Sequence, residues 1–219
     1  MQADETTTDK PTTLWQGALL LAAFAFGCTA IVAATFNATK ERIAANELKL
    51  MMQRFEPVMA PVKYDTILVD APLSLVRPGL LPGDGEALVY PVLSRQRTVA
   101  YAFIVTTIGY AGPVRLLIGI SMEQIVTGVR VIEHQETPGL GDKIDAARSD
   151  WILTFLDRSI GDPPLVGWAI RADDGDFEQF TGASITPRAV VKAVRDTLLY
   201  FSEHKSELEG AIGTASVSK

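Results

Sequence analysis

The residues best suited to chemistry lie in the stretch 177–198, FEQFTGASITPRAVVKAVRDTL, where hydroxyl side chains surround a glycine–alanine pair. A hydroxyl N-cap followed by proline at the first helical position is a typical helix start, so Thr186 and Pro187 predict the N-terminus of a helix. This cap accounts for Thr186 but leaves the preceding Thr181–Ser184 unexplained.

Two interpretations of Thr181–Ser184 stay open. Gly182 permits a positive φ or a close approach of the backbone, as a simple turn before a helix requires. Alternatively, Ser184 lies just ahead of free helix N–H groups, whose partial positive charge suits a phosphate. A hydroxyl at that place can hydrogen-bond a phosphate or be esterified to one.

A second loop, EHQETPGLGDK at 133–143, combines proline and glycine with charged residues. Pro138, Gly139 and Gly141 predict a rigid loop with exposed backbone N–H groups. Those groups and Lys143 can hydrogen-bond a flat polar heterocycle. The alternative is a connector between a strand and a helix, with Asp142 or Asp145 as the N-cap.

Composition excludes several other chemistries. The single cysteine, Cys28, can form neither an intrachain disulfide nor an iron–sulfur cluster. His134 and His204 lack metal-ligand spacing, and the acidic residues at 173–176 lack the spacing of an EF-hand. Because the formal charge is −6 and no Lys/Arg-rich run occurs, nucleic-acid binding is not expected. Neither a catalytic triad nor a metal site is indicated, so any redox chemistry has to come from an organic cofactor.

An uncharged apolar run at 14–36 precedes these loops. At about 1.5 Å per residue, such a helix spans a hydrocarbon core of roughly 30 Å, and Trp15 stands at one end, where interfacial aromatics are common. We expect a retained single-pass helix. A cleaved signal peptide or a lipoprotein signal at Cys28 is the alternative, but the first needs a basic start and the second a shorter run.

The rest of the chain predicts an α+β domain. Residues 37–56 have helical periodicity and continue the span as a stalk that Pro57 and Pro61 end. The Pro/Gly-rich residues 70–86 predict a loop. Four runs rich in β-branched and aromatic residues predict an antiparallel meander of strands at 87–93, 98–110, 114–121 and 126–134.

The C-terminal third predicts helices packed on this sheet. Trp151 and Leu156 belong to a run with helical spacing, 168–171 is expected as one more strand, and 173–176 as an acidic turn. The last helix is expected over about 187–205, and the Gly/Ala/Ser-rich tail beyond Glu209 is expected to be frayed. The apolar stripe of this helix comprises Val190, Val191, Val194, Leu198 and Phe201.

Together these motifs resemble a known family, the G subunit of the Rnf (also called Rsx) electron-transport complex. The C subunit of the sodium-pumping NADH:quinone reductase is similar but more distant. The resemblance is carried by HQETPGLGDKI (134–144), SDWI (149–152) and DGDFEQFTGASITPRAVVKAV (174–194), in that order behind one membrane helix. It extends from the helix to about Tyr200.

The resemblance implies an antiparallel FMN-binding domain in which FMN is joined through its phosphate, as a phosphoester, to the last residue of an S/T-G-A-T motif. That residue is Ser184 here, where the family usually has threonine. Thr186 is the fallback and Thr181 the third choice. The implied cofactor-binding residues besides Ser184 are Thr181, Gly182, Ala183, Ile185, Thr186, Glu136, Thr137, Pro138, Gly139, Leu140, Gly141 and Lys143. We expect N–H groups near Thr186–Arg188 to stabilise the phosphodiester. From its position alone, and not from the resemblance, Lys143 is expected to stabilise the negative charge of reduced flavin.

The resemblance also implies partners and a location. A separate flavin transferase would attach FMN from FAD, and the chain would relay electrons within an ion-translocating NADH/ferredoxin oxidoreductase complex of several membrane subunits. The flavin domain would face the periplasm from the bacterial inner membrane. Counting charges alone indicates the opposite, because Lys40 and Arg42 follow the span and only Lys10 precedes it; the margin is one residue, and we adopt the family topology.

The expected organisation is a cytoplasmic N-terminus (1–13), a transmembrane helix (14–36), a stalk helix and linker (37–60), an FMN-binding domain (61–205) and a flexible tail (206–219). Two other functions stay open. One is a membrane-tethered module that binds FMN or another phosphorylated ligand non-covalently, and the other is a structural subunit without flavin.

Overall fold

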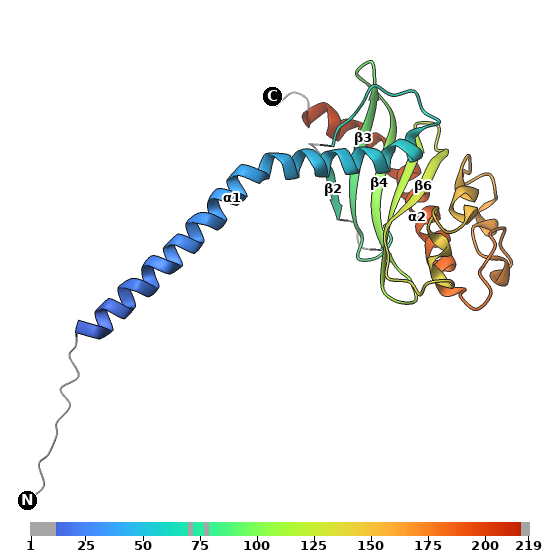
Figure 1. The fold of residues 1–219 in the computed structure, drawn as a ribbon. Helices are drawn as coiled ribbons and strands as arrows, with labels where there is room; N and C mark the ends of the chain where they lie inside the picture. The colour runs from blue at the N-terminus through green and yellow to red at the C-terminus, as the bar shows by residue number, and fades with distance from the viewer. Residues whose placement is uncertain (1–11, 70–71, 77–78, 216–219) are drawn as a thin grey trace, which may run out of the picture. The chain divides into compact units, whose positions relative to one another are not determined.

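A computed structural model describes residues 12–69, 72–76 and 79–215 of the chain (Figure 1). The chain divides into two compact units, Met1–Leu50 and Met51–Lys219, which are described separately. The expected cytoplasmic segment, apart from its last two residues, lies outside the described residues.

The described part of the N-terminal unit is helical. Helix α1 (Thr12–Met59) contains a stretch, Trp15–Lys40, that is long and apolar enough to cross a membrane, with a mean hydropathy of 2.2. The hydroxyls of Thr29 and Thr35 have hydrogen-bond acceptors within the helix, because each donates to the carbonyl four residues earlier at 2.8 Å. Such internal pairing is what a hydrocarbon environment requires of polar groups. The stretch overlaps the span expected at 14–36.

The end of α1 differs from the prediction. The helix continues through Pro57 to Met59, so this proline does not end the stalk. The reason is packing in the second unit, where Phe55, Val58 and Met59 are buried. The ring of Phe55 meets that of Tyr90 edge-on, with centroids 5.2 Å apart. Burial of these side chains outweighs the backbone hydrogen bond that a proline removes.

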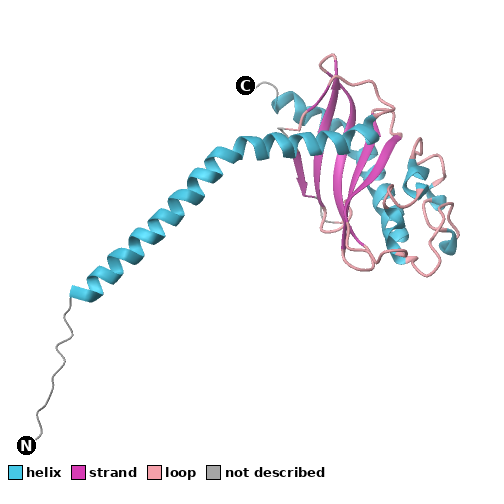
Figure 2. Ribbon diagram, viewed as in Figure 1, coloured by secondary structure: helices cyan, strands magenta, loops and turns pink. Residues whose placement is uncertain are grey.

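The second unit is built on an antiparallel sheet, which has six strands within the described residues (Figure 2). The spatial order is β1-β3-β4-β5-β6, and β2 also pairs with β3. The strands are β1 (Thr66–Ile67), β2 (Leu73–Val76), β3 (Glu86–Ser94), β4 (Arg97–Ile108), β5 (Pro113–Ser121) and β6 (Val126–Glu133). Strands β3 to β6 form the predicted meander. The loop predicted over 70–86 is wrong at β2, where Leu73 pairs with Val89.

Helix α2 (Ile185–Ala215) covers one face of the sheet. Tyr101 and Phe103 of β4 contact Phe201 of α2, with ring centroids 5.4 and 6.0 Å away. Intervening residues of β4 point to the other face, where Ala102 joins a cluster that includes Met59. This alternation follows from the two-residue period of a strand.

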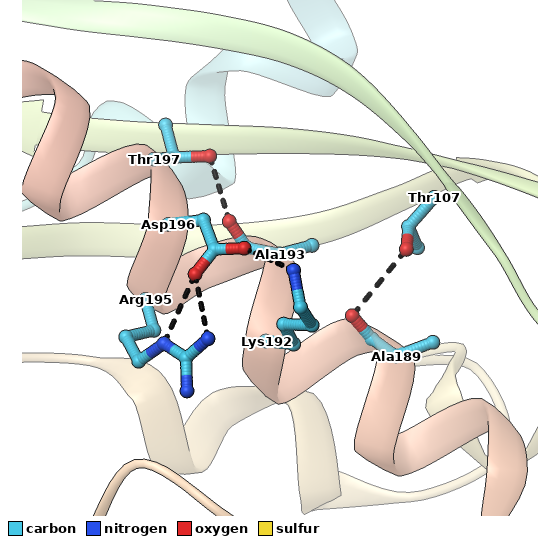
Figure 3. A network of polar contacts seen from close by, with 7 residues as sticks. All are labelled: Thr107, Ala189, Lys192, Ala193, Arg195, Asp196 and Thr197. Carbon is cyan, nitrogen blue, oxygen red and sulfur yellow. Dashed lines mark hydrogen bonds and ion pairs between the residues drawn. The ribbon is translucent and has the colours of Figure 1, made fainter. Parts of the chain in front are cut away.

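Polar contacts accompany this packing (Figure 3). The Thr107 hydroxyl of β4 donates to the Ala189 carbonyl at 3.5 Å and links the sheet to α2. Asp196 of α2 accepts from Lys192 at 2.5 Å and from the Arg195 guanidinium at 2.8 Å. Residues 185–215 therefore have one apolar face and one charged face, and the whole apolar stripe predicted from Val190 to Phe201 is buried.

Both ends of α2 differ from the prediction. The helix begins at Ile185 and not at Pro187. Proline is tolerated there because the first N–H groups of a helix have no partner inside it. The helix continues to Ala215, and Leu208 is buried against the core, so the helix extends into the segment expected as a tail. Residues 216–219 lie outside the described part.

Residues 134–184, between β6 and α2, contain only short 3-10 helices: η1 (Gly141–Ile144), η2 (Asp150–Phe155), η3 (Leu165–Gly167) and η4 (Arg171–Asp173). The helical spacing around Trp151 corresponds to η2. The strand predicted at 168–171 is wrong, since Ile170 makes a single bridge with Phe177. The apolar residues of this segment are core residues of an irregular loop: Trp168 and Ile170 are buried, and the Trp168 ring packs on Phe177 with centroids 5.2 Å apart.

Candidate functional site

A cavity of about 230 Å³ lies where the β4–β5 turn, the loop after β6 and the start of α2 meet. Two loops that are far apart in sequence, 133–143 and 181–186, therefore form one site. The residues that line it are Tyr110, Glu136, Thr137, Leu140, Gly141, Gly182, Ala183, Ser184 and Ile185.

Ser184 occupies the position just before α2. It is half-buried, it lines the cavity, and its carbonyl accepts from the Arg188 N–H at 3.2 Å, the first turn of the helix. Ser184 is therefore the N-cap residue, and the N-cap predicted at Thr186 is wrong. Gly182 has φ +78°, in the left-handed region that glycine favours, so the turn before the helix depends on it.

Thr186 has a different place. Its side chain is 0% exposed, and its hydroxyl donates to Oε2 of Glu136 at 2.7 Å. The same hydroxyl oxygen accepts from the backbone N–H of Tyr110 at 3.2 Å. Thr186 thus connects α2 to both of the other segments that border the cavity, and no face of it is open to a ligand.

Glu136 is the buried partner in this network, with 5% of its surface exposed. Its second carboxylate oxygen, Oε1, accepts from the Ala111 N–H at 3.1 Å. A side chain at either Gly109 or Gly141 would overlap the carboxylate, so both glycines are needed for the space it occupies. The Glu136 N–H donates to Nδ1 of His134 at 3.1 Å, which gives that histidine a structural contact.

Neither Asp142 nor Asp145, the two candidates under the alternative interpretation of this loop as a connector, is the N-cap of η1 or η2. Asp142 is buried and accepts from the Gly139 N–H at 2.7 Å, so it holds the loop closed. Asp145 follows η1 at its C-terminal end. The N-cap of η2 is Ser149, whose hydroxyl accepts from the Trp151 N–H at 3.2 Å.

Five of the residues expected at the site do not line the cavity: Thr181, Thr186, Pro138, Gly139 and Lys143. Lys143 is exposed on η1, so the geometry gives no support to contact between its ammonium group and a ring in the cavity. The first turn of α2 has few N–H groups left for an anion. Pro187 has no N–H, and the Arg188 N–H donates to the Ser184 carbonyl. The N–H groups of Ile185 and Thr186 are therefore the ones that can bind an anion.

The nearest helix cation is also engaged. The Arg188 guanidinium donates to both oxygens of Asp173, at 2.5 and 2.9 Å. These hydrogen bonds lower the pKa of Asp173. Arg188 is therefore paired at the surface, and the positive character at the cavity comes from the helix N-terminus.

An apolar border surrounds Ser184. Tyr110 is 73% exposed, Leu140 45% and Ile185 47%, and all three line the cavity. Large apolar side chains left open beside a cavity are typical of ligand sites, and flat aromatic rings pack well against such groups. The residues present therefore fit FMN: an apolar border for the ring, and a hydroxyl with helix N–H groups for the phosphate. Tyr110 was not predicted, because only tertiary structure brings the β4–β5 turn to this loop.

Comparison with known proteins agrees with this geometry and defines the class. Residues 109–199, which include the whole cavity, match the FMN-binding domain family, so the chain contains a domain of this class. Residues 1–58 match the RnfG N-terminal region.

The particular family follows from full-length relatives. The chain is 36% identical to the G subunit of the ion-translocating oxidoreductase complex of Aliivibrio fischeri, covering 90% of this chain and 95% of the relative. It is 40% identical to the corresponding protein of Shewanella amazonensis (86% and 88% covered) and 38% identical to that of Pseudomonas aeruginosa (88% and 91%). The chain belongs to the family of G subunits of ion-translocating oxidoreductase complexes, as the motifs had indicated.

Proposed function

We propose that this chain is a membrane-anchored flavoprotein subunit that relays electrons through FMN bound covalently to Ser184, within an ion-translocating NADH/ferredoxin oxidoreductase complex. The observation that carries the proposal is the half-buried Ser184 in the wall of the cavity, at the start of α2. The names of the relatives support the assembly into a complex with other membrane subunits.

Exposure favours Ser184 over the other two hydroxyls as the attachment residue. Thr186 is 0% exposed and its oxygen already has two hydrogen-bond partners, so a transferase cannot reach it without unfolding the first turn of α2. Thr181 is exposed but lies outside the cavity. Ser184 combines access with a place in the cavity wall, and serine supplies the same nucleophilic oxygen as the threonine usual in the family.

The attachment step is a phosphoryl-group transfer by a separate flavin transferase. The Ser184 hydroxyl oxygen bonds to the FMN-side phosphorus of FAD, the pyrophosphate P–O bond breaks, AMP leaves, and the hydroxyl proton is released. The product phosphodiester keeps one negative charge beside the Ile185 and Thr186 N–H groups, where the helix dipole favours an anion. The isoalloxazine ring of FMN supplies the electron chemistry.

The size of the cavity favours covalent over non-covalent binding. Its volume is about 230 Å³, whereas sites that enclose a drug-sized ligand occupy roughly 300–1,000 Å³. FMN would be enclosed only in part, so a covalent bond prevents its loss. We place the flavin domain on the periplasmic side of the inner membrane, where a lost cofactor would not be recovered, and the N-terminus in the cytoplasm.

The test is denaturing gel electrophoresis of the full chain co-expressed with the transferase. We expect a fluorescent band under ultraviolet light for the wild type and none for Ser184→Ala. A yellow native protein that loses its colour on denaturation would support the non-covalent module, and a colourless protein would support a structural subunit; either result contradicts the proposal.

A further inference from the structure

We propose that the Glu136–Thr186 pair is a positioning device that fixes the Ser184 hydroxyl in the geometry needed for flavin attachment. This inference rests on the proposed function and assigns a role to two residues that do not themselves react. It follows from the contacts, the burial and the sequence position of the pair.

The contacts join three separate segments. Thr186 belongs to the first turn of α2, Glu136 to the loop after β6, and the N–H groups of Tyr110 and Ala111 to the β4–β5 turn. The Thr186 hydroxyl donates to Glu136 at 2.7 Å and accepts from Tyr110 at 3.2 Å, and Glu136 accepts from Ala111 at 3.1 Å. All three segments contribute walls to the cavity.

Glu136 and Thr186 are both buried, so their hydrogen bond is part of the protein interior and not an incidental surface contact. Glu136 is almost fully buried, and within the described residues no lysine, arginine or histidine forms an ion pair with its carboxylate. Burying such a group is unfavourable unless it is hydrogen-bonded. The absence of side chains at Gly109 and Gly141 leaves the space for it. An apolar residue in its place would leave the Ala111 N–H and the buried Thr186 hydroxyl without their acceptor, so the carboxylate holds both of these segments at the cavity.

Sequence position connects the pair to the reacting atom. Thr186 lies two residues after Ser184 in the chain, so any rotation or shift of the first turn of α2 moves the Ser184 hydroxyl as well. A displacement of about 1 Å in a reacting group can lower a rate on the order of 10²-fold. The pair therefore acts on the attachment rate through the position of Ser184.

The matched variants are Thr186→Val, Thr186→Ser and Thr197→Val. Valine keeps the shape of threonine but removes its hydroxyl, and serine restores the hydroxyl without the methyl group. Thr197 is the control, because it is also fully buried in α2 and its hydroxyl donates to the Ala193 carbonyl at 2.7 Å (Figure 3). Neither Thr197 nor Ala193 lines the cavity. Glu136→Gln tests the other partner, since an amide oxygen and an NH₂ group cannot accept from both donors.

The measurement is the initial rate of covalent FMN incorporation into the purified full chain in detergent, with FAD and the transferase. We expect Thr186→Val to lower the rate by on the order of 10²-fold, Thr186→Ser to recover most of it, Glu136→Gln to lower it, and Thr197→Val to match the wild type. The residual product of Thr186→Val should still carry FMN at Ser184. Circular dichroism establishes that each variant is folded.

Two outcomes overturn the inference alone: a wild-type rate for Thr186→Val, or an equal loss in Thr186→Val and Thr197→Val. In both, the wild type still carries FMN at Ser184, so the proposed function stands. If the wild type acquires no covalent flavin, or acquires it at Thr186, the proposed function itself fails.

Discussion

The Thr186 hydroxyl donates to the Glu136 carboxylate at 2.7 Å across a separation of 50 residues in the sequence. This contact brings the TGAS segment and the ETPGLG loop to one cavity, although neither segment contains a strand or an α-helix of its own. The same threonine oxygen accepts from the Tyr110 N–H and so holds the backbone of the β4–β5 turn at the cavity. The exposed Tyr110 side chain lines the cavity there.

Tyr110 is expected to contact the isoalloxazine ring. Its side chain is largely exposed yet lines the cavity next to Ser184, and aromatic rings favour offset stacking on one another. A tyrosine in contact quenches flavin emission, so Tyr110→Leu should increase the fluorescence of the native flavoprotein. The measurement is emission per covalently bound flavin, before and after denaturation.

Two controls accompany the Tyr110 variant. Tyr110→Trp should preserve the quenching, and Lys143→Met, at an exposed position outside the cavity, should leave the native emission unchanged. All variants should emit equally once denatured. Equal native emission of Tyr110→Leu and the wild type would show that the ring lies elsewhere.

The regular part of the fold could be predicted from the sequence because its signals are local. Strands β3 to β6 are eight residues or longer and rich in β-branched and aromatic residues, and the stripe from Val190 to Phe201 marks the buried face of α2. The element ends were not predictable in the same way. Helix α1 continues through Pro57, Leu73 pairs in a strand beside a Pro/Gly-rich segment, and Leu208 is buried although the sequence around it is polar. In each case tertiary packing outweighs the local sequence signal.

The candidate site could be predicted only in part for the same reason. Ser184 and the ETPGLG loop were recognisable as motifs, but their proximity depends on the buried pair of Glu136 and Thr186. Thr186 looked like a helix cap from its hydroxyl and the following proline. Only the burial of its side chain distinguishes a tertiary hydrogen bond from a local one.

Gly119 of β5 is expected to be essential for the packing of the C-terminal end of α1 on the sheet. A Cβ atom there would overlap the Thr127 hydroxyl and the Met59 methyl group, and would lie 2.7 Å from a methyl of Val58. Gly119→Ala should therefore lower the free energy of unfolding by about 1–3 kcal/mol, as overpacking typically does. Urea unfolding of the full chain in detergent measures this.

Gly161→Ala provides the control for Gly119, because no heavy atom lies within 4 Å of the position its Cβ would take. The midpoint of urea unfolding of Gly161→Ala should match that of the wild type. If both variants unfold at the wild-type midpoint, the close approach of the end of α1 to β5 is not rigid.

Tyr101 of β4 is expected to limit stability at high pH. Its hydroxyl is buried, has no hydrogen-bond partner among the described residues, and does not reach hydrogen-bond geometry with the nearby Thr98. Burial raises the pKa of Tyr101 from 10.0 to about 12. The raised value means that the contribution of neutral Tyr101 to stability is complete below pH 10 and is lost as the pH rises toward about 12.

Replacing Tyr101 by Phe separates these effects. Removing an unpaired buried hydroxyl should raise the free energy of unfolding by about 1 kcal/mol at neutral pH. The difference from the wild type should grow between pH 10 and 12, because only the wild type has the ionisable group. A variant less stable than the wild type at neutral pH would indicate that the hydroxyl is paired.

The attachment residue is the central claim, and fragment-ion mass spectrometry of the peptide that contains Thr181, Ser184 and Thr186 tests it most directly. The wild-type chain, co-expressed with the flavin transferase, should carry FMN on Ser184. Ser184→Thr should carry it on the new threonine, and Ser184→Ala should carry none. FMN on Thr186 or Thr181 of the wild type, or covalent flavin retained in Ser184→Ala, would contradict the account.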